Sequence, residues 1–252
     1  MLQKGAVGEV IGVFSQGIYA RFGEELLLLH DAKWGSAPFG IALDGFAAFA
    51  EAVKASVRES VTLSEDGITF GARHFPLTVS APEMPMPARL SRPSAQRIAS
   101  VEGYLLENGA KGGMLDLIAE DRGNVRASIG ALMQNDPAAA RMVGLGRGLT
   151  PSGDDFFCGF FAVADAMGDT RFDAVREAVL ASLDRTTAVS AAYLRHALTG
   201  GYFTVYDRAV RALCADEPFA LNCDFVLALG ASSGTDTLLG AVTAAKLVSP
   251  LM

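Results

Sequence analysis

Apolar residues in the first ninety positions come in short runs that turn residues separate, a pattern typical of β-strands. The runs expected as strands are residues 7–14, 17–21, 24–30, 60–63, 68–70 and 74–80. One longer amphipathic stretch, F-A-A-F-A-E-A-V-K-A, is expected as a helix with Asp44 as its N-cap. The pattern predicts a small, β-rich, barrel-like N-terminal domain.

Composition changes after these strands. Four of the ten prolines lie within residues 81–93, A-P-E-M-P-M-P-A-R-L-S-R-P. Proline at this density is typical of an extended linker. We therefore expect a β-rich domain over residues 1–85 and a second domain over residues 86–252.

Beyond the linker, apolar residues recur at helical spacing almost to the end of the chain. The expected helices span residues 94–108, 115–120, 125–135, 137–143, 151–167, 172–184, 188–198, 205–215, 219–228 and 236–247. The sequence predicts an α+β protein, in which the small β-rich domain precedes a larger all-α domain.

Composition narrows the classes of function. Half of the residues are apolar and 19% are charged, which is typical of a globular protein, and the net charge of −7 argues against a nucleic-acid partner. An uninterrupted apolar run of about 18 residues would indicate a membrane span, and the chain has none. The N-terminus lacks the apolar core of an export signal, and the three cysteines lack metal-type spacing. We expect a cytoplasmic protein with reduced thiols.

The most informative segment is G-L-G-R-G-L-T-P-S-G-D-D-F-F, residues 144–157. Thr150 as N-cap, Pro151 at the first helical position and acids in the first turn predict a helix start. The four glycines exceed what a cap needs, and they allow a close approach of the backbone to a ligand. Arg147 has the planar fork that suits phosphate or carboxylate. The segment is either an elaborate helix cap or an anion site.

A second segment, residues 232–240, repeats this plan. Both segments read x-S-G-x-D-x-x-x-G, and each leads into an apolar helix. Two such starts suggest that two helix N-termini converge on one pocket. The residues expected to bind substrate are Arg147, Gly148, Thr150, Ser152, Gly153, Ser233, Gly234 and Thr235, and those expected to be catalytic are Asp154, Asp155 and Asp236.

The role of the acids stays open at this point. Carboxylates at Asp154 and Asp155 would repel an anion unless a divalent cation such as Mg²⁺ bridged them to it. They could instead accept hydrogen bonds from substrate N–H groups, or hold the loop. No metal ligands are assigned.

The motif G-L-G-x-G-L-T-P-S-G-D-D-F, with the later Ser-Ser-Gly-Thr-Asp-Thr start, resembles the family of the AllH subunit of oxamate carbamoyltransferase. The resemblance implies a subunit of a multi-protein enzyme of anaerobic allantoin and purine breakdown. It implies transfer of a carbamoyl group between carbamoyl phosphate and oxamate, with oxalurate as the other reactant. Carbamoyl phosphate and oxamate are small anions, and two converging helix N-termini would suit such ligands.

Three hypotheses follow. The favoured one is a carbamoyltransferase-related subunit that binds a small anionic metabolite and acts with partner subunits. The second is a non-catalytic binding or scaffold subunit of a multi-protein enzyme. The third is a Mg²⁺-dependent hydrolase or phosphotransferase that uses the aspartates.

Overall fold

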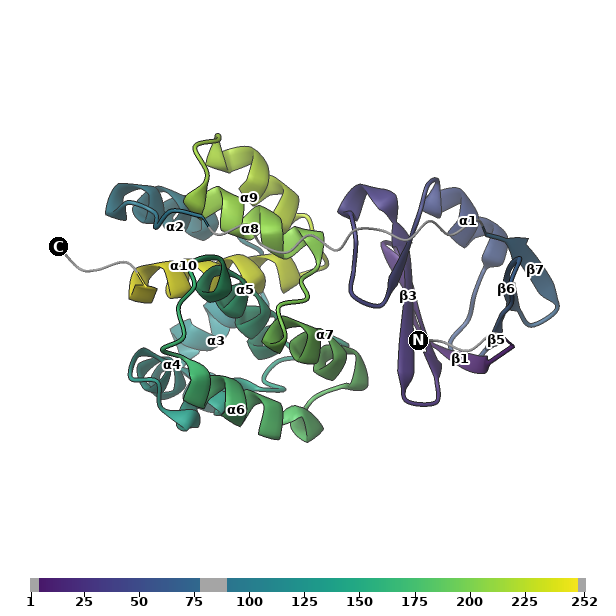
Figure 1. Ribbon diagram of the computed structural model, residues 1–252, viewed down its shortest axis with the longest axis horizontal. Coiled ribbons are helices and arrows are strands. Elements are labelled where there is room, and N and C mark those ends of the chain that lie inside the picture. Colours follow the sequence, from purple (N-terminus) through teal and green to yellow (C-terminus); the bar gives the residue numbers. More distant parts are fainter. Residues whose placement is uncertain (1–4, 78–89, 249–252) are drawn as a thin grey trace. The chain divides into compact units, whose positions relative to one another are not determined.

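The computed structural model describes residues 5–77 and 90–248. Contacts divide the chain into two compact units, residues 1–84 and 85–252. The first unit is a curled half-barrel sheet, and the second is helical (Figure 1). The predicted fold class, a small β-rich part followed by a larger all-α part, is confirmed.

The sheet of the first unit has seven strands in the order β4-β3-β2-β1-β5-β6-β7. Among the described strands, β3 and β4 pair in parallel, and the other neighbours are antiparallel. The strands are β1 (Val7–Phe14), β2 (Gly17–Phe22), β3 (Glu25–Asp31), β4 (Gly40–Leu43), β5 (Ser60–Leu63), β6 (Gly67–Phe70) and β7 (Arg73–Pro76).

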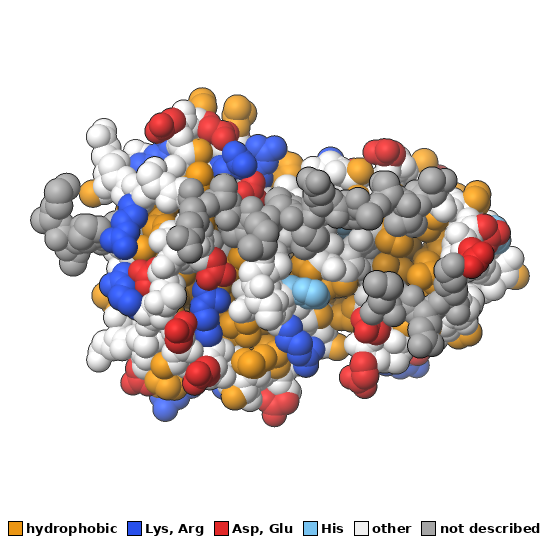
Figure 2. Space-filling view, viewed as in Figure 1, with side chains coloured by type: hydrophobic (Ala, Val, Ile, Leu, Met, Phe, Trp, Pro, Cys, Tyr) orange, Lys and Arg blue, Asp and Glu red, His pale blue; other side chains and the backbone are white. Residues whose placement is uncertain are grey.

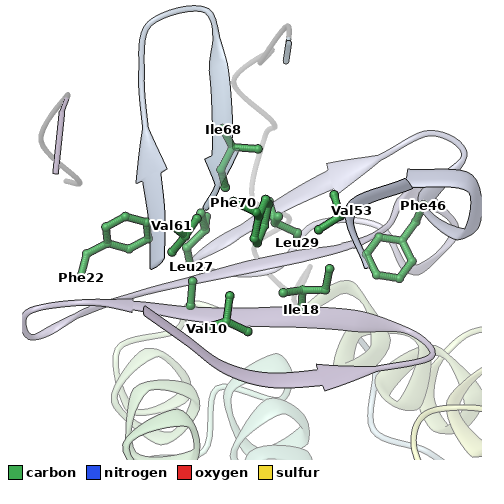
Figure 3. Close-up of a cluster of buried hydrophobic side chains, with 11 residues drawn as sticks. Val10, Ile18, Phe22, Leu27, Leu29, Phe46, Val53, Val61, Ile68 and Phe70 are labelled. Atoms are coloured by element: carbon green, nitrogen blue, oxygen red, sulfur yellow. The ribbon is translucent and has the colours of Figure 1, made fainter. Parts of the chain in front are cut away.

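Apolar side chains fill the concave side of this sheet, as Figure 3 shows. The helix α1 (Phe46–Val53) contributes its first and last residues to this core. The labelled members of the cluster are Val10, Ile18, Phe22, Leu27, Leu29, Phe46, Val53, Val61, Ile68 and Phe70. The unit thus has a hydrophobic core of its own.

One local prediction in this unit was wrong, and one strand was not predicted. The N-cap of α1 is Gly45, at a left-handed φ of 72°, and not Asp44. The strand β4 was not predicted, because G-I-A-L is too short to show alternation. The predicted linker at residues 81–89 and the end of the predicted strand, residues 78–80, lie outside the described residues.

The second unit is built from helices that follow the predicted segments closely. They are α2 (Ala95–Asn108), α3 (Met114–Glu120), α4 (Val125–Met133), α5 (Ser152–Ala166), α6 (Asp173–Ala181), α7 (Ala188–Leu198), α8 (Thr204–Cys214), α9 (Phe219–Leu227) and α10 (Ser233–Val248). The expected helix at residues 137–143 is a 3-10 helix, Pro137–Met142.

The helix α5 lies at the centre of this unit. All of its residues except Asp165 are buried, so it is a core helix that other helices surround. It packs most extensively against α10, and also against α7 and α8. The two helices that follow the glycine-containing motifs are therefore direct neighbours.

The surface of the helical unit is mixed in charge. On the face shown in Figure 2, acidic and basic side chains are interspersed. Within residues 5–77 and 90–248, no helix is both long and apolar enough to cross a membrane.

Candidate functional site

Reciprocal glycine contacts join α5 and α10. A Cβ on Gly159 would lie 1.9 Å from the carbonyl oxygen of Thr237, and a Cβ on Gly240 would lie 1.9 Å from that of Phe156. Gly159 and Gly240 are equivalent in the repeated motif, and so are Phe156 and Thr237. The two helices therefore pack backbone against backbone, and each contributes one glycine that lies against the main chain of the other.

The first turns of α5 and α10 lie side by side. The hydroxyl oxygens of Thr150 and Ser233 are 3.1 Å apart. The Ser233 hydroxyl, on α10, forms a hydrogen bond with Asp155 on α5. The Ser152 hydroxyl, on α5, forms the matching bond with Asp236 on α10. Each helix start thus supplies a hydroxyl to the carboxyl group of the other.

The start of α5 differs in detail from the prediction. Pro151 occupies the N-cap position and Ser152 is the first helical residue, so Thr150 is not the cap. The amide N–H groups of Asp154 and Asp155 both donate to the carbonyl of Pro151, at 2.9 and 3.2 Å. These amides are satisfied within the helix and are not presented to an anion.

The two motif glycines have packing partners as well. The Gly153 N–H donates to Leu145 O at 2.8 Å, and the Gly234 N–H donates to Leu229 O at 3.0 Å. A Cβ on Gly153 would lie 2.0 Å from Met142 O, and one on Gly234 would lie 1.9 Å from a main-chain carbonyl of α9. Both glycines allow the helix start to sit on the segment before it.

Asp154 connects the glycine-containing loop to α7. Its Oδ1 accepts the Gly144 N–H at 2.9 Å, and its Oδ2 accepts the Ser190 hydroxyl at 2.7 Å and the Thr186 hydroxyl. Burial raises the pKa of this carboxyl group, and the hydrogen bonds oppose that rise. The side chain is 1% exposed. Asp154 is a fully bonded anchor for the loop.

Asp236 has a comparable structural environment. Its Oδ1 accepts the Met114 N–H at 2.6 Å, and its Oδ2 accepts the Ser232 hydroxyl at 3.1 Å. Burial raises the pKa of Asp236 to about 6. The neighbouring Thr235 accepts the Ala110 N–H at its hydroxyl, at 2.8 Å. These two residues fix the segment that leads into α3.

Asp155 is different, because one of its oxygens is unsatisfied. The residue is 5% exposed, and its Oδ2 has no hydrogen-bond partner among the described residues. Burial, and then the charge of Asp236, raises the pKa of this carboxyl group well above its usual value, while the Ser233 and Thr150 hydroxyls lower it. A buried carboxyl group of this kind is favoured in its neutral form.

A thiol and a phenol lie behind Asp155. Burial raises the pKa of the Cys158 thiol, the charge of Asp155 raises it further, and a hydrogen bond from Tyr206 opposes the rise. Cys158 was expected to be a core residue, and it is buried. The contribution of Tyr206, from α8, could not be foreseen, because no local pattern links residue 206 to the motif.

Arg147 and Gly148 lie at the exposed tip of the loop. Gly146 and Gly148 have positive φ values of 126° and 92°, which glycine adopts without strain. Arg147 forms no ion pair within the part of the chain that the structure describes. The Thr187 hydroxyl donates to the Leu149 carbonyl and holds the loop where it returns to the helix.

The described aspartates do not form an evident metal centre. Within residues 5–77 and 90–248, no three His, Cys, Asp or Glu side chains are grouped so that they could hold a metal ion. The structure brings together Thr150, Ser152, Asp155, Ser233 and Asp236, whereas it gives Gly153, Asp154, Gly234 and Thr235 contacts within the protein. This cluster offers hydroxyl groups and a neutral carboxyl group as hydrogen-bonding groups.

Residues 142–245 match the model of the family described as oxamate carbamoyltransferase subunit AllH. The match covers under half of the 252-residue chain and includes both helix starts. The resemblance inferred from the loop sequence is confirmed over this range. No solved structure matches the chain.

Proposed function

We propose that the chain is a carbamoyltransferase-related subunit of purine- or allantoin-type nitrogen catabolism. Its substrate is a small anion such as carbamoyl phosphate or oxamate, bound where α5 and α10 begin. The family match over residues 142–245 supports the class of chemistry. The unpartnered oxygen of Asp155 supports the location.

Asp155 is the observation that carries this location. A buried polar atom without a partner costs about 1–3 kcal/mol, so a chain seldom retains one that no ligand, ion or water satisfies. The hydroxyls of Thr150 and Ser233 lie beside it. Together they provide hydrogen bonds of fixed direction, and catalysis would then rest on positioning and electrostatic stabilisation.

Arg147 supplies the positive charge in this proposal. It lies three residues before Thr150, in the same loop, and is exposed and unpaired within the described residues. A guanidinium group binds carboxylate or phosphate through two parallel hydrogen bonds. Asp154 and Asp236 act as positioning residues, because hydrogen bonds from the protein occupy both of their carboxylate oxygens.

Replacement of Arg147 tests the proposal directly. Arg147→Ala is expected to weaken binding of carbamoyl phosphate or oxamate by about tenfold or more, because a charge-assisted bond is lost. Isothermal titration calorimetry measures this affinity. Arg195→Ala removes another exposed arginine of the same unit and should leave the affinity unchanged. Equal affinities for wild type and Arg147→Ala would contradict the role given to Arg147.

Two further measurements test whether partner subunits and Mg²⁺ are required. The matching family is described as a subunit, so turnover is expected to require partner chains that the isolated chain lacks. If the isolated chain binds substrate without turnover, and partners restore turnover, the chain is a binding subunit. Titrations with and without Mg²⁺ show whether a cation links the aspartates to the anion.

A further inference from the structure

The two helix starts of the site are equivalent in their hydroxyl–carboxyl bonds. Asp155 and Asp236 occupy the same place in the repeated motif, and so do Ser152 and Ser233. Ser233 bonds to Asp155, and Ser152 bonds to Asp236. The hydrogen-bond partners of the two aspartates can therefore be compared directly.

The difference between them is one N–H donor. Asp236 receives the main-chain N–H of Met114 at 2.6 Å, from the beginning of α3. At Asp155 no main-chain donor takes this place among the described residues, and Oδ2 stays unpartnered in a side chain that is 5% exposed. One oxygen of Asp236 thus accepts a main-chain N–H, whereas one oxygen of Asp155 has no hydrogen-bond partner among the described residues.

The groups that face Asp155 also select the kind of ligand. They are Asp236 and Ser233 from α10, Asp154 and Cys158 from α5, and Thr150 from the loop. Tyr206 of α8 lies behind them. No lysine or arginine is among the largest influences on the pKa of Asp155. An anionic group at this point would meet carboxyl groups without a cation, whereas an N–H donor would complete the hydrogen bonding.

We infer that Asp155 is a specificity-determining residue, whose Oδ2, with the carboxyl proton on the other oxygen, accepts an N–H of a carboxamide or carbamoyl group, so that the amide end of the ligand faces Asp155. The anionic end then points away from the two carboxyl groups. This inference rests on the proposed function and adds the orientation of the substrate to it. A site that pairs with an N–H group rejects an isostere that lacks it, because its own polar atom is left unsatisfied.

Oxamate and oxalate are matched probes for this inference. They have nearly the same shape, and they differ in that oxamate has an amide where oxalate has a second carboxylate. The affinities of the full chain for both are measured by calorimetry at pH 7, with EDTA present to remove metal ions that oxalate would chelate. We expect wild type to prefer oxamate by about tenfold or more. This comparison needs no variant.

Asp155→Asn is then compared with wild type. An asparagine can turn its NH₂ group toward a carboxylate, so the preference for oxamate should fall to within about threefold. Asp173→Asn makes the same change in the first turn of α6 and should keep the wild-type preference. Circular dichroism establishes that both variants are folded.

The outcomes separate the inference from the function on which it rests. Equal affinity of wild type for oxamate and oxalate, or a preference that survives Asp155→Asn, overturns the inference and leaves the proposed function standing. If neither oxamate nor carbamoyl phosphate binds to the wild-type chain, the proposed function itself is contradicted.

Discussion

At the residue scale, three aspartates close together in the fold differ in what satisfies their oxygens. Asp154 accepts three hydrogen bonds from the protein, and Asp236 accepts a main-chain N–H and serine hydroxyls. Asp155 keeps one oxygen unpartnered. The same side chain therefore anchors a loop, positions a helix or stays available for a ligand, according to its neighbours.

The raised pKa of Asp236 predicts a stability that depends on pH. Its pKa is about 6 in the folded protein, against an ordinary value of 3.8. The folded state therefore holds this proton more tightly, and the stabilisation is present below pH 4 and lost as the pH rises to about 6. The loss is on the order of 3 kcal/mol. Urea unfolding followed by circular dichroism at several pH values measures it.

Asp236→Asn is the comparison for this measurement, because asparagine does not titrate. The difference in unfolding free energy between wild type and variant should change across this window, and the asparagine variant should gain relative stability as the pH rises. The comparison cancels the contributions of other acids whose pKa is raised, such as Asp165. A pH-independent difference would contradict the raised pKa.

Residue types at the site could be predicted, but their partners could not. Serine, aspartate and glycine before an apolar run identify a helix start from local sequence alone. The donor to Asp236 is Met114, which lies 122 residues away in sequence. Likewise, nothing in the pattern around Gly153 shows that its N–H is used by Leu145. Such pairings depend on tertiary packing.

At the element scale, the helices were predicted closely because apolar periodicity reports the buried face of a helix. The helix α7 begins and ends at the predicted residues, Ala188–Leu198. The helix α10 begins at Ser233, three residues before the predicted start. Serine and glycine are weak helix formers, and here packing of Gly234 on the preceding helix outweighs that preference.

The glycine contacts between α5 and α10 predict a large loss of stability on substitution. Gly159→Ala places a Cβ 1.9 Å from a main-chain oxygen, so the helices must separate. We expect the free energy of unfolding to fall by about 3 kcal/mol or more, as in severe overpacking. Gly240→Ala should behave in the same way, and thermal unfolding measures both.

Gly103→Ala is the matched control within the helical unit. Gly103 lies in α2, and a Cβ there has no neighbour within 4 Å. This variant should gain about 0.5–1 kcal/mol, because alanine favours the helix over glycine. Equal effects of Gly103→Ala and Gly159→Ala would show that helix propensity, and not the contact between α5 and α10, determines the result.

At the scale of the whole molecule, each compact unit has its own buried core. The sheet closes over an apolar cluster that includes Val10, Ile18 and Phe70, and the helical unit is organised around α5. We expect residues 85–252, expressed alone, to fold with helical circular dichroism and to bind oxamate as the full chain does. An unfolded fragment, or loss of affinity, would show that the site needs the first unit.

The class of fold followed from the succession of strand-like and helix-like segments, but the arrangement of the sheet did not. β1 pairs with β5, which lies beyond three further strands and the helix α1, and β3 pairs in parallel with β4. These pairings join distant segments, and their register depends on the shared core. The half-barrel could be expected in outline only.

The reciprocal glycine contacts have a consequence for how the two halves of the site can diverge. The atoms nearest to a Cβ added at either glycine belong to the main chain, at Thr237 for Gly159 and at Phe156 and Phe160 for Gly240. The packing therefore restricts the glycines and leaves the identity of the touched residues free. An aromatic ring and a hydroxyl now occupy these equivalent positions. Backbone packing of this kind tolerates different side chains at equivalent positions of the two helices. The surroundings of one carboxyl group can therefore change while the backbone contacts between the helices stay the same.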